Sequence, residues 1–68
     1  MKNRVKVLRT QKGWSQQQLA DLLGVSRQAI NAIERDKHDP SLKLAFELAK
    51  IFSSDVQSMF HPDSSEDQ

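Results

Sequence analysis

Four residues in the middle of the chain carry side chains that can recognise the edges of DNA bases: Arg27, Gln28, Asn31 and Ala32. Arginine can make two hydrogen bonds to guanine, glutamine or asparagine can make two to adenine, and alanine can pack against the thymine methyl group. On a helix that buries Ile30 and Ile33, all four lie toward the other side. The alternative is an ordinary solvated helix face, because such polar residues are common on surfaces.

The stretch 15–34 predicts two short helices joined by a tight turn, which would position these side chains. Ser15 can cap the first helix, and Gln18 can complete a capping box with it. Gly24 suits the left-handed position after a helix, and Ser26 can cap the second helix. This arrangement has the form of a helix-turn-helix, in which the start of the second helix enters the major groove. The context therefore favours base recognition over a solvated face.

The same stretch resembles the Cro/CI-type (XRE-family) helix-turn-helix domain. The matching residues are Ser15-Gln16-x-x-Leu19-Ala20-x-x-Leu23-Gly24-Val25-Ser26-Arg27-Gln28-x-Ile30-x-x-Ile33-Glu34, followed by Asp39-Pro40-Ser41-Leu42. The resemblance covers about residues 4 to 60 and implies an all-α, compact five-helix, lambda-repressor-like DNA-binding domain. It also implies a cytoplasmic regulator of bacterial or phage origin, similar to the small stand-alone homodimeric repressors.

Further residues could contact the DNA backbone. Gln16 opens the first of the two helices, where backbone N–H groups and the helix dipole favour a phosphate, and the resemblance implies a side-chain bond there as well. In the family the loop after Glu34 runs along the DNA, which makes Arg35 and Lys37 phosphate candidates. The remaining candidates are Gln17, Arg9 and Lys43, of which Lys43 has a solvated lysine as its simpler interpretation.

The resemblance also places Arg9 against Glu34. Arginine suits this position because its planar fork can bond a carboxylate and still reach toward a phosphate. Two unrelated surface charges are the alternative. Trp14 lies between the first two helices, and we expect it to be a half-buried lid on the core rather than a contact with nucleic acid.

Helical patterns continue on both sides of this stretch. The sequence predicts a helix over 3–12, one capped by Ser41 and running to about Phe52, and a short one over 55–60 capped by Ser54. Residues 1–60 then form one domain, and the polar, acidic segment 61–68 is expected to be disordered. Because this segment lacks alternating apolar residues, it gives little support for terminal strands, and the sequence leaves open whether the termini form them.

The composition narrows the class of protein. The chain has 68 residues, no cysteine and a net charge of +1. Ten bases against six acids give residues 1–60 a net charge of +4, which suits a nucleic-acid binder. No residue set typical of an active site, cofactor or metal is present, and no apolar run is long enough to span a membrane. We therefore expect no enzyme activity, cofactor, metal, membrane span or small-molecule ligand.

These features together predict a sequence-specific regulator, a repressor in our interpretation, that binds double-stranded DNA. A homodimer would double the few base contacts of one chain and match a palindromic operator. The expected dimer surface consists of Phe46, Ile51, Met59 and Phe60, with completion of the monomer core as the alternative. A second class of function also stays open, namely an antitoxin or other protein-binding module with the same fold.

Overall fold

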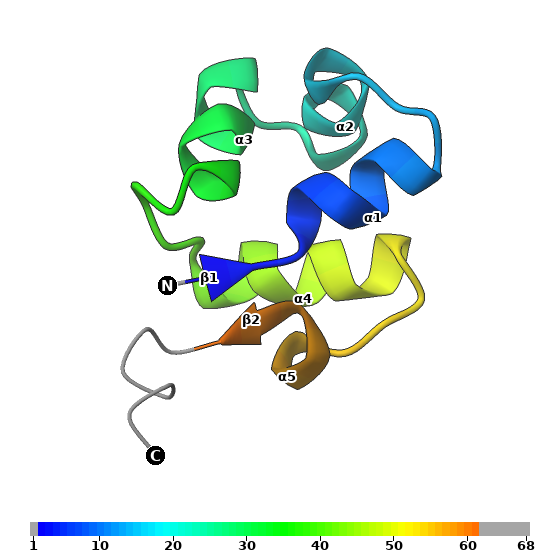
Figure 1. The fold of residues 1–68 in the computed structure, drawn as a ribbon. Helices are drawn as coiled ribbons and strands as arrows, with labels where there is room; N and C mark the ends of the chain where they lie inside the picture. The colour runs from blue at the N-terminus through cyan, green and yellow to red at the C-terminus, as the bar shows by residue number, and fades with distance from the viewer. Residues whose placement is uncertain (1, 62–68) are drawn as a thin grey trace.

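The computed structural model of the chain describes residues 2–61 (Figure 1). Helices α2 and α3 lie together at one end of the molecule, α4 and α5 at the other, and α1 lies between them. The elements in chain order are β1 (Lys2–Asn3), α1 (Val5–Gln11), α2 (Gln16–Leu23), α3 (Arg27–Glu34), α4 (Leu42–Ile51), α5 (Val56–Met59) and β2 (Phe60–His61). The predicted all-α, five-helix fold is confirmed.

Short polar side chains start the helices where the sequence indicates. The Ser15 hydroxyl accepts a hydrogen bond from the Gln18 N–H at 3.0 Å, and the Gln18 side chain accepts one from the Ser15 N–H at 2.7 Å. Ser26 and Ser41 cap α3 and α4 in the same way. Each cap satisfies an N–H group that has no partner within its helix.

The start of α5 differs from the prediction. Asp55, not Ser54, is the capping residue, because its carboxylate accepts a hydrogen bond from the Ser58 N–H at 2.7 Å. Serine and aspartate cap helices about equally well, so neighbouring candidates of these two types cannot be ranked by residue type. The helix consequently begins at Val56, one residue later than expected.

The turn between α2 and α3 depends on Gly24. Its backbone is left-handed, with φ 71° and ψ 30°, as the sequence predicts. Its N–H group donates to carbonyl oxygens in the last turn of α2, and the Val25 N–H donates to the carbonyl of Ala20 at 3.0 Å. These bonds end α2 and fix the angle at which α3 leaves it.

Replacing Gly24 by alanine is expected to lower the free energy of unfolding by about 1–2 kcal/mol, the cost of a left-handed backbone for a residue with a Cβ. A Cβ at this position would meet no atom within 4 Å, so the loss is conformational and not steric. Urea unfolding followed by circular dichroism measures it. Gly24→Asn is the control, since asparagine tolerates this conformation better. A larger loss for Gly24→Asn than for Gly24→Ala would contradict this explanation.

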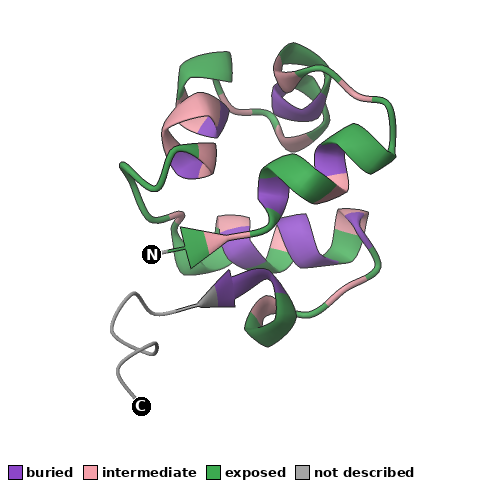
Figure 2. Cartoon of the chain, in the orientation of Figure 1, coloured by how far each residue is buried: buried purple, intermediate pink, exposed green. Residues whose placement is uncertain are grey.

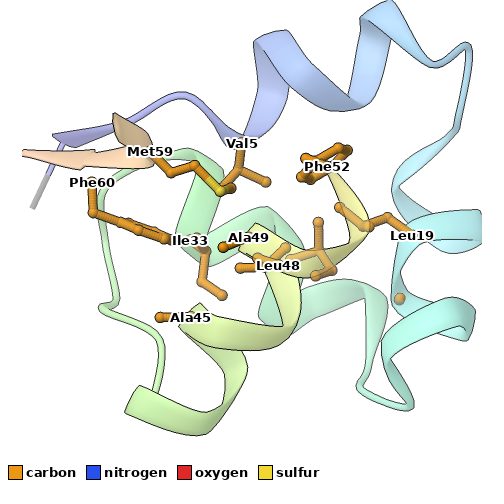
Figure 3. Packing of buried hydrophobic residues seen from close by; sticks show 11 residues of the cluster. Val5, Leu19, Ile33, Ala45, Leu48, Ala49, Phe52, Met59 and Phe60 are labelled. Carbon is orange, nitrogen blue, oxygen red and sulfur yellow. The ribbon is translucent and has the colours of Figure 1, made fainter. Parts of the chain in front are cut away.

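Side chains from all five helices and from β2 form one core (Figure 3). Val5, Leu19, Ile30, Leu48 and Met59 are fully buried. Trp14 is half-buried and packs on Phe52, with ring centroids 5.7 Å apart, so the predicted lid on the core is confirmed.

The core also corrects the proposed dimer surface. Met59 is 0% exposed and Phe60 is 7% exposed. In Figure 3 the Met59 side chain points toward Val5 and the Phe60 ring toward Ile33, within a single chain. They complete the monomer core, so neither is available to a second copy without unfolding the end of the domain.

Two short strands, which the sequence analysis does not predict, join the two ends of the described chain. β1 and β2 pair antiparallel, with Lys2 opposite His61 and Asn3 opposite Phe60. Phe60 is extended (φ −122°, ψ 133°) and not helical, because burial of its ring directs the chain back along β1. His61, assigned to the tail, belongs to β2, and the disorder expected for the tail concerns residues 62–68, outside the described part.

Candidate nucleic-acid interface

The four base-contact candidates lie on the side of α3 that faces away from the core. Ile30 and Ile33 are 0% and 2% exposed, whereas Arg27 and Gln28 are exposed. Asn31 and Ala32 are half-buried. Figure 2 shows the same division, with the first turn of α3 open to solvent and later turns partly covered. One helix face therefore offers a guanidinium, two carboxamides and a methyl group.

Gln16 connects this face to the rest of the domain. Its Nε2 donates to Glu34 Oε1 at 3.0 Å. Its Oε1 accepts long hydrogen bonds from Arg27 Nη1 at 3.4 Å and from Asn31 Nδ2 at 3.5 Å. The sequence predicts a phosphate contact for Gln16 but not these contacts, which depend on how closely the start of α2 approaches α3.

Arg9 and Glu34 form a buried pair beneath Gln16. Arg9 Nε and Nη2 donate to the two Glu34 carboxylate oxygens at 2.6 and 3.2 Å, and Nη1 donates to the Trp14 carbonyl at 2.7 Å. Their side chains are 11% and 2% exposed. The pairing implied by the resemblance is present, and it ties α1 to the end of α3. Burial leaves Arg9 little surface for the phosphate contact that it was also expected to make.

These contacts form one chain of polar groups that we call the Gln16 network: Arg9, Glu34, Gln16, Arg27 and Asn31. The buried ion pair lies at one end, and the exposed Arg27 and the half-buried Asn31 lie at the other. Glu34 accepts bonds from both Arg9 and Gln16, so its carboxylate has defined partners on two sides. The network can restrict the rotamers of Arg27 and Asn31 before DNA is bound.

The remaining phosphate candidates are exposed, but one of them, Gln17, already makes a side-chain hydrogen bond. Gln17 donates through Nε2 to Asp21 Oδ1 at 2.8 Å along the outer side of α2. Arg35 and Lys37 lie exposed on the loop after α3, and Lys43 is exposed in the first turn of α4. Of the phosphate candidates, Gln16 thus contacts α3 directly, whereas Arg35, Lys37 and Lys43 follow α3 in the sequence.

Asn3 is a residue whose role the sequence analysis missed. Its Nδ2 donates to the Ile33 carbonyl at 2.8 Å and to Asp36 Oδ1 at 3.2 Å, and its Oδ1 accepts from the Val5 N–H at 3.0 Å. Asp36 has a left-handed backbone with φ 59°. Asn3 therefore fixes the start of the loop that carries Arg35 and Lys37. A local sequence pattern cannot predict such a contact, because the partners lie 30 and 33 residues away.

Two further findings concern other kinds of site. Among residues 2–61, no three histidine, cysteine, aspartate or glutamate side chains gather where they could hold a metal ion. Within the same range, no helix has the length and apolar character needed to cross a membrane.

Comparison with known proteins agrees with this geometry. Residues 5–57 match the family HTH_3, described as helix-turn-helix. Over 60 residues the chain is 52% identical to an uncharacterized HTH-type transcriptional regulator of Methanocaldococcus jannaschii and 45% identical to one of Bacillus subtilis; each match covers 88% of this chain and 91% of the relative. A regulator of Archaeoglobus fulgidus with the same description is 35% identical over 66 residues, covering 97% and 94%.

Proposed function

The chain belongs to the XRE-type helix-turn-helix family and is a transcriptional regulator with a helix-turn-helix DNA-binding domain, and from this premise we propose that it is a repressor that binds an inverted-repeat operator as a homodimer. Arg27, Gln28, Asn31 and Ala32 of each copy contact base edges in the major groove. Gln16, Gln17, Arg35, Lys37 and Lys43 contact phosphates. These backbone contacts set the orientation of α3, and the base contacts select the sequence.

The Gln16 network is the observation that carries the proposal. A side chain that becomes fixed only on binding loses rotamer freedom, at a cost of about 0.5–1.5 kcal/mol for a flexible residue. The Gln16 carboxamide already contacts Arg27 and Asn31 in the free protein, at 3.4 and 3.5 Å. Long bonds of this kind are easily exchanged for shorter bonds to bases. The network therefore supports a surface whose side chains are positioned for recognition in the free protein and can still exchange their partners when DNA binds.

A homodimer follows from the amount of sequence that one α3 can read. The base contacts of one helix cover only a few base pairs, and a two-fold dimer doubles them on an inverted repeat. Half-sites on one face of B-DNA lie about 34–36 Å apart.

Repression is the simplest consequence of such binding. A dimer that covers an operator excludes polymerase from the same DNA, and this mechanism needs no activation domain. The proposal of repression thus rests on steric exclusion by the DNA-bound dimer.

Selection of bound duplexes from a random DNA pool tests the proposed function. The selection is done near physiological salt, because protein–DNA affinity depends steeply on ionic strength. We expect enrichment of an inverted repeat with half-sites about one helical turn apart. A single enriched half-site would support the recognition of DNA and contradict the dimer. Folded protein that enriches no sequence would contradict the proposal and favour the protein-binding module instead.

A further inference from the structure

The loop after α3 begins with an aspartate in a conformation that glycine usually adopts. Asp36 has φ 59° and directly follows Arg35, the C-cap residue of α3. Its N–H donates to the Ile33 carbonyl at 3.1 Å, and the Lys37 N–H donates to the Ala32 carbonyl at 2.9 Å. This pair of bonds is a Schellman motif, which ends a helix through one left-handed residue. A Cβ makes that conformation unfavourable, so contacts from outside the loop help to keep it.

Asn3 makes such contacts from β1. Its Nδ2 donates to the Ile33 carbonyl at 2.8 Å and to Asp36 Oδ1 at 3.2 Å. A carboxamide nitrogen carries two hydrogens, so it can serve both acceptors at once. One group of Asn3 therefore binds both the last turn of α3 and the side chain of the left-handed residue.

The Asn3 side chain is itself held in place by its neighbours in the core. Its Oδ1 accepts from the Val5 N–H at 3.0 Å, and the residue pairs with Phe60 across the two strands. The next N–H along the chain, that of Arg4, donates to the Met59 carbonyl at 2.9 Å. Met59 and Phe60 are buried, and β1 lies beside the loop between α3 and α4 (Figure 1). The donor nitrogen is thus supported from the core and directed at the loop.

The charge of Asp36 makes this contact relevant to DNA. Asp36 lies in sequence between Arg35 and Lys37, and all three residues are exposed. A carboxylate that turned outward would repel phosphates, and it could also pair with either neighbouring cation. The bond from Asn3 instead holds one carboxylate oxygen on the β1 side of the loop.

We propose that Asn3 is a positioning residue for DNA binding, which holds the Asp36 carboxylate toward β1 and so keeps Arg35 and Lys37 available to phosphates. This role rests on the proposed function, because that function assigns these two cations to the DNA backbone. Phosphate contacts carry no direct sequence information. Asn3 therefore affects the affinity for every duplex and leaves the choice of bases to the exposed face of α3.

Asn3→Asp removes the donor and retains the oxygen that accepts from the Val5 N–H. The affinities for selected and random duplexes should fall alike, by about 2- to 10-fold for each bound chain, because the loop side chains are no longer ordered in advance. The salt slope should fall by about one, as a phosphate contact is lost. Fluorescence anisotropy over a range of salt measures both quantities. Partial unfolding alone would reduce the active fraction and leave the salt slope unchanged.

Gln57→Glu is the matched control for the added charge. Gln57 is exposed on α5, at the opposite end of the molecule from α2 and α3. The substitution is the same change from amide to acid. Exposed charges further apart than about 8 Å are largely screened at physiological salt, so Gln57→Glu should change the affinity for either duplex by less than about twofold.

Combining Asn3→Asp with Asp36→Asn reverses the bond and keeps the wild-type net charge. The new carboxamide can donate to the new carboxylate, which then lies on β1. The salt slope and the affinities for both duplexes should return close to the wild-type values. The urea midpoint should stay below that of the wild type, because the Ile33 carbonyl still lacks its bond from residue 3. Binding that recovers without stability separates a positioning role from a purely structural one.

Three results would contradict the role of Asn3. The first is an equal salt slope and an equal affinity for random duplex in Asn3→Asp and Gln57→Glu. The second is a combined variant that circular dichroism shows to be folded but that does not recover the salt slope. The third is a loss confined to the selected duplex, which would place the effect of Asn3 on the base contacts.

Binding to random duplex separates this inference from the proposed function. It needs no operator, so Asn3→Asp can be compared with its control even if duplex selection enriches no sequence. In that case the proposed function fails, while a lowered and recoverable salt slope supports the role of Asn3. An enriched inverted repeat together with a wild-type salt slope in Asn3→Asp would leave the proposed function standing and overturn the inference.

Discussion

Substitution of Glu34 by glutamine is expected to destabilise the domain by about 3–5 kcal/mol, the usual loss when one partner of a buried ion pair is removed. The Glu34 side chain is 2% exposed and accepts hydrogen bonds from Arg9 and Gln16. An amide removes the negative charge and leaves the buried Arg9 guanidinium without a counter-charge. Because domains are stable by only about 5–15 kcal/mol, much of the population could unfold at moderate temperature. Urea unfolding followed by circular dichroism gives the change directly.

The same acid-to-amide change at Asp21 is the control. The Asp21 side chain is exposed and accepts a hydrogen bond from Gln17, one turn earlier in α2. Exposed pairs on one helix contribute about 0.2–0.5 kcal/mol, so Asp21→Asn should have little effect. If Glu34→Gln is no more destabilising than Asp21→Asn, burial of the pair does not matter for stability.

A double variant can separate the two roles that we assign to Glu34. Replacing a buried ion pair by apolar residues of similar volume is often neutral for stability. Arg9→Met combined with Glu34→Leu should therefore recover much of the lost stability. It should not recover full affinity for the selected duplex, because Gln16 Nε2 would have lost its acceptor. Full recovery of both would show that Glu34 does not position Gln16 for DNA binding.

Loss of the Arg27 side chain should weaken binding to the selected duplex by about 1–3 kcal/mol per half-site, or roughly 5- to 150-fold. The reason is that Arg27 is exposed at the start of α3, where it can make paired bonds to guanine. Binding to random duplexes should change much less, because those complexes depend on phosphates. Fluorescence anisotropy titrations with both kinds of duplex, over a range of salt, measure the difference.

Lys37→Ala is the matched control for Arg27→Ala. Lys37 is exposed on the loop after α3, and its expected partner is a phosphate. Its loss should weaken binding to selected and random duplexes alike and reduce the salt slope by about one for each half-site. Equal losses on both duplexes for Arg27→Ala would instead assign that residue to the backbone contacts.

The parts of the structure that follow from local chemistry could be predicted from the sequence. Ser15, Ser26 and Ser41 cap helices because a hydroxyl satisfies an N–H group only three residues away. Gly24 adopts a left-handed backbone that few other residues tolerate. These local signals were sufficient for the helix-turn-helix, and for placing the base-contact candidates on one face of α3.

Features that depend on distant contacts could not be predicted in the same way. The bonds from Gln16 to Glu34 and from Asn3 to Asp36 join residues 18 and 33 positions apart. The sequence predicts Phe60 as the last apolar residue of a helix, but its ring is buried in the core and its backbone pairs with β1. From the sequence pattern alone, an apolar residue near the end of a domain is equally compatible with the core and with a dimer interface. This ambiguity explains why the predicted dimer surface wrongly includes Met59 and Phe60.

The pairing of β1 with β2 has a consequence for how the domain is made. Chains are synthesised from the N-terminus at about 5–20 residues per second, and β1 must wait until Phe60 and His61 have been added. The helix-turn-helix is complete in the growing chain well before Met59, whose side chain is fully buried against the earlier helices. Until that residue arrives the nascent chain exposes part of its core. The regulator therefore gains its stable DNA-reading surface only after almost all the described residues have left the ribosome.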